Sequence, residues 1–502
     1  MILFILLLSF LWLCFYNFYY KRRNLPPGPI PLPLFGNALS IFTVTSFEEM
    51  YIKWQKKYGN VYTYWQAETP MVVIADFNTI QETLQRDGDS YTGRQNLENF
   101  NRYLTDGAYG IVNTEGDIWR EHRRFALHVL RDFGLGKNLM QDRVLNEVDH
   151  VIGNLKVQIK DSSEEEEYDL VEEVDVAIGS IINSILFGYS FHGEKFAEYQ
   201  TLQALMHDMF KAFLNPLLLL SLTHPKFISK IPFIGGAVLQ LKHCNDELYK
   251  FFNGQIEEHR KSIDFETDST PTDFVEAYLR EAHKKDKEGV EHSFSKNQLA
   301  TTCADLWTAG QETTNTTLAW GLAYMISHPE EQEKLHQELD RVVGSTDRLV
   351  TITDRLNLHY TNAVVAEVQR IANILPQNLP RKTTREVTIN GVTIGKDVIV
   401  LPQIGNVLFD EKLFPKPLEF NPSRFIDENG CFKKCDELIP FSMGKRQCLG
   451  EPLARMELFL FIANIFNSFK LLPGAKPVDL ARKRGFISKN EKFKCKIEIR
   501  SK

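Results

Sequence analysis

The chain has 502 residues, of which 43% are hydrophobic, and this is enough for a large globular core. Its formal net charge of −7 gives no support for binding to nucleic acid. Seven cysteines without a framework of close pairs argue against a disulfide scaffold and favour a reducing compartment. No internal repeat or change of composition divides the body, so we expect one large domain over residues 38–502.

Residues 1–20 are almost wholly apolar or aromatic, and basic residues 21–23 follow directly. Roughly 20 apolar residues suffice to span a bilayer. A cleaved signal peptide is the alternative, but a basic start and a small-residue cleavage site are both missing. We therefore expect a membrane anchor, with the body in the cytosol by the positive-inside rule. The proline-rich residues 21–37 are predicted to form a stiff hinge.

In the first half of the body, residues 61–66 and 71–75 are predicted to be paired strands, and Asp76 is a plausible N-cap for the helix that follows. The polar stretches 161–167 and 264–272 are expected to be surface loops. The intervening region, 178–261, is predicted to contain several helices, including 202–214. Within it, residues 227–234 are apolar where a loop is expected, and our hypothesis is that they dip into the membrane.

A further helix is predicted to open at residues 116–124. Trp119 and Arg123 are four residues apart and so share one face of it. This motif alone is equally consistent with a solvated basic face. His122 and His128 are expected to be surface residues rather than ligands.

A long helix is predicted from the N-cap Ser295 to Ser327, ending before His328-Pro329. Its middle, residues 309–314, contains a glycine and two threonines, which are poor helix formers. Small residues also allow helices to pack closely, but a weak segment inside a long helix is often a functional site.

Residues 360–372 form the next predicted helix, on which Glu367 and Arg370 lie three residues apart. Such a pair is weak evidence by itself. The alternating segment 385–401 around Asn390-Gly391 predicts a β-hairpin.

The most informative stretch is a loop over residues 441–450, in which one cysteine, Cys448, precedes the helical run 453–466. The N–H groups and dipole of a helix N-terminus favour a thiolate, and Arg446 is suited to a carboxylate. Taken alone, Cys448 could be an ordinary buried cysteine. A zinc site with Cys431 and Cys435 is a weaker alternative, because no fourth ligand stands at a customary spacing.

The pattern F-x-x-G-x-R-x-C-x-G resembles the haem-binding signature of the cytochrome P-450 monooxygenases, with matches at Phe441, Gly444, Arg446, Cys448 and Gly450. The resemblance implies that haem b is the cofactor and that Cys448 is the axial ligand of its iron. In this family the thiolate promotes cleavage of the O–O bond.

Residues 309–314 resemble the family's (A/G)-G-x-(D/E)-T-(T/S) signature at every position. By that resemblance Thr313 hydrogen-bonds oxygen during the reaction and Glu312 relays protons, while Ala309 and Gly310 leave room above the ring. Such a pair can supply the protons that O–O cleavage needs.

Other positions gain a role only through the resemblance. It places a group of side chains at the haem propionates: Arg94, Trp119, Arg123 and Arg381. It assigns Glu367, Arg370 and Arg424 to a buried structural cluster. The side chains expected to line the substrate pocket are Phe100, Leu205, Phe210, Ile374 and Phe486.

The resemblance implies a mainly α fold with a smaller β region, in which haem lies between the long helix and the helix after Cys448. The implied reaction is monooxygenation of an apolar small molecule of xenobiotic, steroid or fatty acid type. Electrons come from NADPH through a flavoprotein reductase, with cytochrome b5 as a second candidate partner, at the endoplasmic reticulum membrane. Lys433, Lys434 and Lys445 are expected to form a basic face that could dock the reductase.

Two other classes stay open. A haem-thiolate isomerase or dehydratase would need no external electrons, but such enzymes commonly lack the threonine found here as Thr313. A non-catalytic haem sensor would need neither a proton relay nor a reductase face.

Overall fold

The computed structural model describes residues 2–501 except 96, 135–137, 161–165, 216 and 268. Most of the expected surface loop at 161–167 therefore lies outside the described residues. The other expected loop, 264–272, is confirmed in its described part as a largely exposed connection between two helices.

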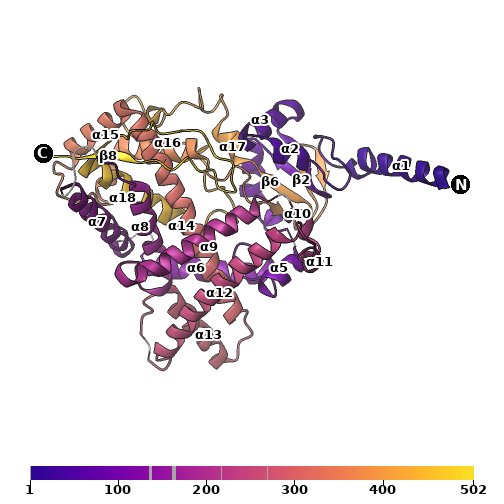
Figure 1. Ribbon diagram of the computed structural model, residues 1–502, viewed down its shortest axis with the longest axis horizontal. Coiled ribbons are helices and arrows are strands. Elements are labelled where there is room, and N and C mark those ends of the chain that lie inside the picture. The colour runs from indigo at the N-terminus through magenta and orange to yellow at the C-terminus, as the bar shows by residue number, and fades with distance from the viewer. Residues whose placement is uncertain are drawn as a thin grey trace.

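The body is mainly helical, with a smaller amount of sheet, and the largest of its sheets lies at the end nearest the N-terminal helix (Figure 1). The predicted fold class is confirmed. The helices are α1 (Ile2–Phe18), α2 (Ala38–Thr43), α3 (Phe47–Tyr58), α4 (Phe77–Ile80), α5 (Glu98–Thr105), α6 (Gly116–Asp132), α7 (Asn138–Lys160), α8 (Leu170–Phe187), α9 (Phe196–Phe213), α10 (Leu218–Ser221), α11 (Pro225–Ile228), α12 (Gly236–Ser262), α13 (Phe274–Glu288), α14 (Lys296–Ser327), α15 (Pro329–Val342), α16 (His359–Ala372), α17 (Ile404–Leu408) and α18 (Glu451–Ser468).

The largest sheet has the strand order β1-β2-β6-β3. Its first two strands form the predicted hairpin, and β2 then pairs in parallel with β6, placing Met71 opposite Ile399. This pairing joins the start of the body to the segment that carries Arg381. The strands are β1 (Val61–Gln66), β2 (Thr69–Ile74), β3 (Arg381–Lys382) and β6 (Ile399–Pro402).

Two smaller sheets have two strands each. The predicted hairpin at Asn390-Gly391 is confirmed, and both residues have positive φ angles, 47° and 78°, as a tight type I′ turn requires. The strands are β4 (Val387–Ile389), β5 (Val392–Ile394), β7 (Phe469–Pro473) and β8 (Cys495–Ile499).

Helix α14 runs through the centre of the body and packs against α8, α16 and α18. The Ser295 side chain caps it by accepting from the N–H of Gln298, and the helix ends before His328-Pro329, as predicted. Its C-terminal half is almost entirely buried, so packing on all sides stabilises a segment whose own helix propensity is weak.

Helix α1 projects alone from the body (Figure 1). In the described part of the chain it is the one segment, Ile2–Arg22, that is long and apolar enough to cross a membrane. Its base is tied to the body: Lys21 Nζ lies 2.9 Å from a Glu68 carboxylate oxygen and 4.7 Å from the centre of the Trp65 ring. The hinge is therefore attached to the β1–β2 hairpin rather than being a free spacer.

The apolar segment 227–234 is not wholly a loop, because α11 covers its first two residues. Phe227 and Phe233 are 66% and 99% exposed. Figure 1 places α11 at the end of the body from which α1 projects.

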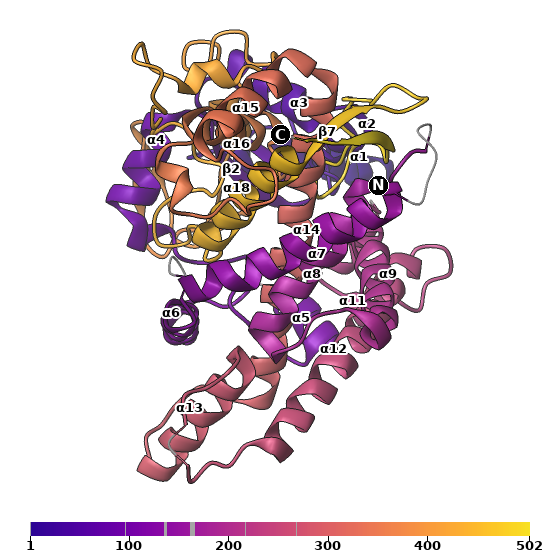
Figure 2. The same ribbon diagram turned by 90° about the vertical axis from the view of Figure 1, so that its left-hand side faces the viewer.

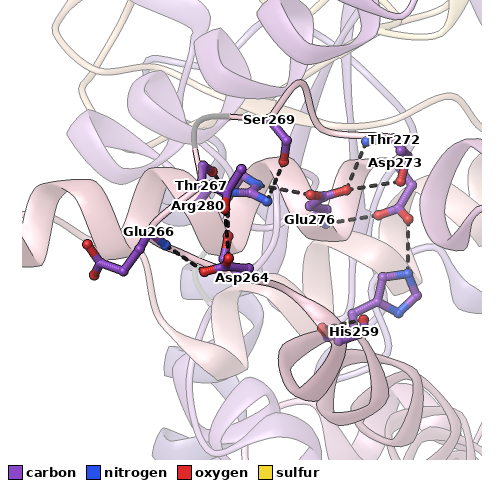
Figure 3. A network of polar contacts seen from close by, with 10 residues as sticks. His259, Asp264, Glu266, Thr267, Ser269, Thr272, Asp273, Glu276 and Arg280 are labelled. Atoms are coloured by element: carbon purple, nitrogen blue, oxygen red, sulfur yellow. Dashed lines mark hydrogen bonds and ion pairs between the residues drawn. The ribbon is translucent and has the colours of Figure 1, made fainter.

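Helices α12 and α13 extend away from the rest of the body in Figure 2. The loop between them is held by Arg280, whose guanidinium donates to the carbonyl oxygens of Asp264 and Thr267 and to the Ser269 hydroxyl (Figure 3). His259 Nε2 lies 3.0 Å from Asp273 Oδ2 in the same network. These contacts explain how a strongly polar loop keeps a defined shape.

Candidate active site

Two backbone hydrogen bonds fix the conformation of the cysteine loop, residues 441–450. The N–H of Cys448 donates to the carbonyl oxygen of Phe441 over 3.1 Å, and the N–H of Gln447 donates to that of Gly444 over 3.0 Å. Gly444 has a φ of 78°, and a Cβ there would lie 1.7 Å from the Leu84 carbonyl oxygen. A glycine is therefore required at 444 by the chain packed against it.

The sulfur of Cys448 lies just before α18, whose N-cap is Gly450. The side chain is accessible to solvent, yet enough protein surrounds the sulfur that burial raises the pKa of the thiol. The N–H groups of Gly450 and Glu451, together with the charge of Arg123, lower that pKa but do not outweigh burial. The N–H groups at the helix N-terminus thus act in the expected direction, toward the thiolate, while burial acts against it. A bound metal cation deprotonates a coordinating thiol.

Arg446 points away from the loop into a set of carbonyl groups. Its guanidinium donates to the carbonyl oxygens of Thr92 (2.8 Å), Ile111 (3.2 Å) and Thr114 (2.6 Å). The guanidinium also lies 3.9 Å from the centre of the Trp119 ring. Trp119 and Arg446 are both buried, so α6 and the cysteine loop meet at this point.

Arg381 and Arg94 lie in the same cluster. Arg381 Nη2 donates to the Ser442 hydroxyl (2.8 Å) and to the Met443 carbonyl oxygen (2.9 Å). Arg94 donates to the carbonyl oxygens of Val112 and Pro380. Two buried N–H groups of the cluster, Arg381 Nη1 and Trp119 Nε1, have no hydrogen-bond partner among the described residues.

The electrostatics of this arginine cluster (Arg94, Arg381 and Arg446) are unfavourable in the protein alone. Burial, and then repulsion from neighbouring arginines, lowers the pKa of Arg94 to about 10, of Arg381 to about 9 and of Arg446 to about 8. No carboxylate in the described part of the chain forms an ion pair with any of the three. The cluster therefore needs an anion from outside the chain.

Helix α6 supplies a link to the cysteine loop. Arg123 Nη2 donates to the carbonyl oxygen of Gln447 over 2.6 Å, next to Cys448. The expectation that His122 is a surface residue was wrong: it is 1% exposed, stacks on Tyr278 and lies 2.9 Å from the Ser293 hydroxyl. It is buried because it faces α13, whereas His128 is exposed as expected.

In the middle of α14, the Thr313 hydroxyl donates to the carbonyl oxygen of Ala309 over 2.6 Å, and this contact fixes its rotamer. Ala309 is exposed although the helix around it is largely buried. Glu312 is 3% exposed and forms an ion pair with Lys489. A Cβ on Gly310 would lie 3.1 Å from Ile182 of α8. A glycine at 310 therefore allows α14 to pack closely on α8.

The three residues expected to form a structural cluster lie together in the core. Arg370 donates two hydrogen bonds to the Glu367 carboxylate, over 2.7 and 2.9 Å, and both side chains are fully buried. Arg424 Nε donates to the same carboxylate over 3.0 Å, as does the N–H of Asn421. This cluster ties α16 to the turn η6 (Pro422–Phe425).

The residues expected to line the pocket are only partly brought together. Phe210 on α9 stacks on Phe486, with ring centres 5.9 Å apart. Leu205 and Ile374 are partly buried against the main core. Phe100 is buried in a different cluster, with residues of α9 and α12.

The basic face is exposed as expected. Lys433, Lys434 and Lys445 are all solvent-accessible, and the last two make only loose or exposed ion pairs, with Asp436 and Asp89. Among the described residues, no group of three His, Cys, Asp or Glu side chains gathers as metal ligands, which leaves the zinc alternative without support.

These residues fit a haem. Its two carboxylates would match the buried arginine cluster and the two unpartnered N–H groups, and its iron would match the accessible sulfur of Cys448.

Comparison with known protein families gives a cytochrome P450 match over residues 26–497. The chain belongs to the cytochrome P450 family. It is 34% identical to cytochrome P450 2E1 of Oryctolagus cuniculus over 91% of this chain and 89% of that one. It is 34% identical to cytochrome P450 2C23 of Rattus norvegicus (91% and 90% covered) and 35% identical to cytochrome P450 2C44 of Mus musculus (91% and 89% covered).

As a cytochrome P450, the chain is a haem-thiolate monooxygenase that uses haem b and receives electrons from NADPH through a reductase. When bound, the haem supplies the activation of O2. Its microsomal relatives and the apolar helix α1 fit anchoring at the endoplasmic reticulum membrane.

Sequence reasoning missed the side chains that hold residues 110–112, the segment next to the arginine cluster. Asp305 of α14 accepts hydrogen bonds from the N–H groups of Ile111 (2.7 Å) and Val112 (2.9 Å). The side-chain amide of Gln298 accepts from the backbone N–H of Gly110 and donates to the Gly110 carbonyl oxygen. Because the carbonyls of this segment accept from Arg94 and Arg446, α14 positions the cluster indirectly. The available signal was a second acidic residue, besides Glu312, within the long helix.

Proposed function

We propose that Cys448 is the axial ligand of the haem iron and that Arg94, Arg381 and Arg446, with Trp119 and Arg123, hold the propionates. The observation that carries this proposal is a buried group of arginines that repel one another and form no ion pair with a carboxylate of the described chain. Two carboxylates brought by the cofactor would relieve this repulsion and accept the unpartnered N–H groups of Arg381 and Trp119.

Glu312 and Thr313 are the proposed proton relay. The carboxyl and the hydroxyl stand on consecutive residues of α14, next to the exposed Ala309. A carboxyl group can take a proton and pass it on, while a hydroxyl can donate and accept at once. In this scheme Thr313 orients the proton donor, and Glu312 exchanges protons with the surroundings.

The proposed organisation has an anchor at 1–20, a hinge at 21–37 and a catalytic domain at 38–502 that faces the cytosol. Phe227 and Phe233 are proposed to enter the same bilayer as α1, because large apolar side chains are exposed at the end of the body from which α1 projects. Substituting serines across residues 227–234 in a chain without the anchor should then release it from membranes. Unchanged membrane binding would contradict this.

The proposed substrate is an apolar xenobiotic, steroid or fatty acid, with Phe210 and Phe486 among the side chains that contact it. Spectral shifts of the holoenzyme with a panel of such compounds would identify the class. The reductase is proposed to dock on Lys433, Lys434 and Lys445, with cytochrome b5 as a second partner. Charge reversal at these lysines should weaken electron transfer without changing the haem spectrum; unaltered coupling to the reductase would exclude this face.

Ligation by Cys448 is tested with Cys448→Ser. The reduced carbonyl complex of the parent protein should show the red-shifted band typical of thiolate ligation, and the variant should lose it. The matched control is Cys435→Ser, because this thiol is also partly accessible but lies outside the loop. A variant at Cys448 that keeps the red-shifted band would refute the assignment.

A further inference from the structure

Glu312 has an ionic partner that neither the motif nor its spacing indicates. A carboxylate oxygen of Glu312 forms an ion pair with Lys489 Nζ, which comes from the segment between β7 and β8. The Glu312 side chain is 4% exposed, whereas that of Lys489 is 50% exposed. A buried acid on the central helix is thus joined to a cation that reaches solvent.

The backbone around Lys489 is fixed, so the contact is not that of a free surface lysine. The N–H of Ser488 donates to the carbonyl oxygen of Ile374 over 2.8 Å, and the Ser488 carbonyl accepts from Trp320 Nε1 over 2.9 Å. The carbonyl of Lys489 itself accepts from the N–H of Lys483 over 2.8 Å. These bonds present the lysine to α14 from a turn that is held on both sides.

A second buried acid lies on the other side of this stretch of α14. Asp175 of α8 accepts hydrogen bonds from the amides of Gln311 (2.8 Å) and Asn315, the residues one before and three after Glu312. Its other oxygen accepts from the Tyr199 hydroxyl of α9 over 2.5 Å.

The Gln203 amide donates to the same oxygen as the Tyr199 hydroxyl. All four favourable acceptor positions of the Asp175 carboxylate are then used, which is an arrangement suited to the charged form.

The two acids and the lysine act on one another electrostatically. Burial raises the pKa of Asp175 to about 6; the charge of Glu312 also raises it and that of Lys489 lowers it. The groups that face Glu312 are Asp175 from α8, Tyr199 from α9 and Lys489 from the 474–494 segment. The cluster therefore holds two carboxylates and one cation, and loss of the cation would leave the Glu312 carboxylate buried without its ionic partner.

We propose that Lys489 is a positioning residue for the proton relay: through their ion pair it fixes the Glu312 side chain beside Thr313. Asp175 supports this arrangement by holding the residues on either side of Glu312 in register. The inference rests on the proposed relay role of Glu312. In this scheme Lys489 acts only through the orientation of the Glu312 side chain.

The first test compares Lys489→Met with Lys489→Arg in the full-length holoenzyme with reductase. In Lys489→Met the fraction of NADPH recovered as oxygenated product should fall several-fold, with a matching rise in peroxide, and Lys489→Arg should restore most of it. The matched control is Lys483→Met, because Lys483 lies in the same turn and is equally exposed but pairs with Glu491. Parental coupling in Lys489→Met, or equal losses in Lys483→Met, would overturn the proposal.

The second test does not depend on turnover. Infrared difference spectra of Lys489→Met minus the parent protein, recorded in H2O and D2O, should show a difference band from a carboxyl group whose ionic partner has been lost. The band should disappear in Lys489→Met combined with Glu312→Gln. Failure to find it, or its disappearance only with Asp175→Asn, would overturn the assignment to Glu312.

The single variant Glu312→Gln distinguishes the relay role of Glu312 from the positioning role of Lys489. Parental coupling in that variant would remove the relay role of Glu312, and with it the proposal for Lys489, whatever the infrared result. Lost coupling in Glu312→Gln with unchanged coupling in Lys489→Met would instead leave the relay standing and overturn the inference about Lys489.

Discussion

Two groups of buried arginines in this protein differ in how their charge is balanced. In the cluster of Glu367, Arg370 and Arg424, one carboxylate accepts from both guanidinium groups over 2.7–3.0 Å. In the cluster of Arg94, Arg381 and Arg446, the acceptors are backbone carbonyls and a hydroxyl, and no ion pair is formed within the described residues.

This difference distinguishes a structural cluster from a ligand-binding cluster. A buried cation that is paired with a carboxylate of the same chain needs no further anion, and its role is to join the segments that carry the partners. A buried cation that contacts only carbonyl and hydroxyl groups is destabilised by the loss of its hydration. Repulsion between such cations lowers their pKa values further. Such a group is completed by an anion that the chain does not itself contain. Removing a charge should therefore mainly affect folding in the first cluster and mainly affect haem retention in the second.

The largest effect is expected from Glu367→Gln. Loss of this carboxylate leaves Arg370 and Arg424 buried without an anion, which should lower the free energy of unfolding by about 3–5 kcal/mol. Urea unfolding and haem content measure the result. Glu419→Gln is the control, since Glu419 makes only an exposed ion pair with Lys416. A haem-loaded Glu367→Gln protein of parental stability would contradict the structural role.

Among the described residues, Glu457 on α18 is a buried acid that has no cation beside it, in contrast to the buried arginines that have no anion. Burial raises the pKa of Glu457 on α18 to about 8, with the Thr314 hydroxyl as its hydrogen-bond donor. Because the unfolded chain releases this proton near pH 4.5, the native state is progressively destabilised as pH rises from about 4.5 to 8.

Glu457→Gln should abolish this dependence. Relative to the parent, the variant should gain little below pH 4.5 and about 3 kcal/mol at pH 7. Urea unfolding between pH 4 and 8 measures the gain. A gain that does not grow with pH would show that Glu457 titrates normally.

Arg381→Met should weaken haem binding more than it weakens folding. Loss of one charge-assisted contact costs about 1.5–3 kcal/mol, which corresponds to roughly 10–100-fold faster haem loss. Transfer of haem to an acceptor protein measures this rate. Arg385→Met is the control, because Arg385 is exposed and pairs with Asp87. Unchanged haem retention in Arg381→Met would place the propionates elsewhere.

The smallest effect is expected on the basic face. Lys434 and Asp436 form an exposed pair, and such pairs contribute about 0–1 kcal/mol. Lys434→Ala should leave the thermal midpoint of the holoenzyme within the scatter of the parent value. A marked loss would mean that this lysine belongs with the paired arginines rather than with the solvated surface.

The sequence predicted those parts of the fold that depend on local pattern. Helix α14 begins at the N-cap Ser295 as expected, and the hairpin at Asn390-Gly391 follows from its turn residues. The signature in α14 and the cysteine loop before α18 are brought together because these two helices pack against each other. His122 could not be placed, because its burial depends on α13, which lies more than 150 residues later. Lys489 and Asp175 were missed for the same reason: their partners are set by tertiary packing and not by spacing.

Attachment of Lys21 to Glu68 and Trp65 has a practical consequence for shortened forms of the protein. A chain that starts at residue 21 keeps the cation that lies over the Trp65 ring. A chain that starts at residue 24 loses that contact and leaves the Glu68 carboxylate without its ionic partner. The two chains differ by three residues, yet only the longer one retains the contacts that attach the hinge to the body.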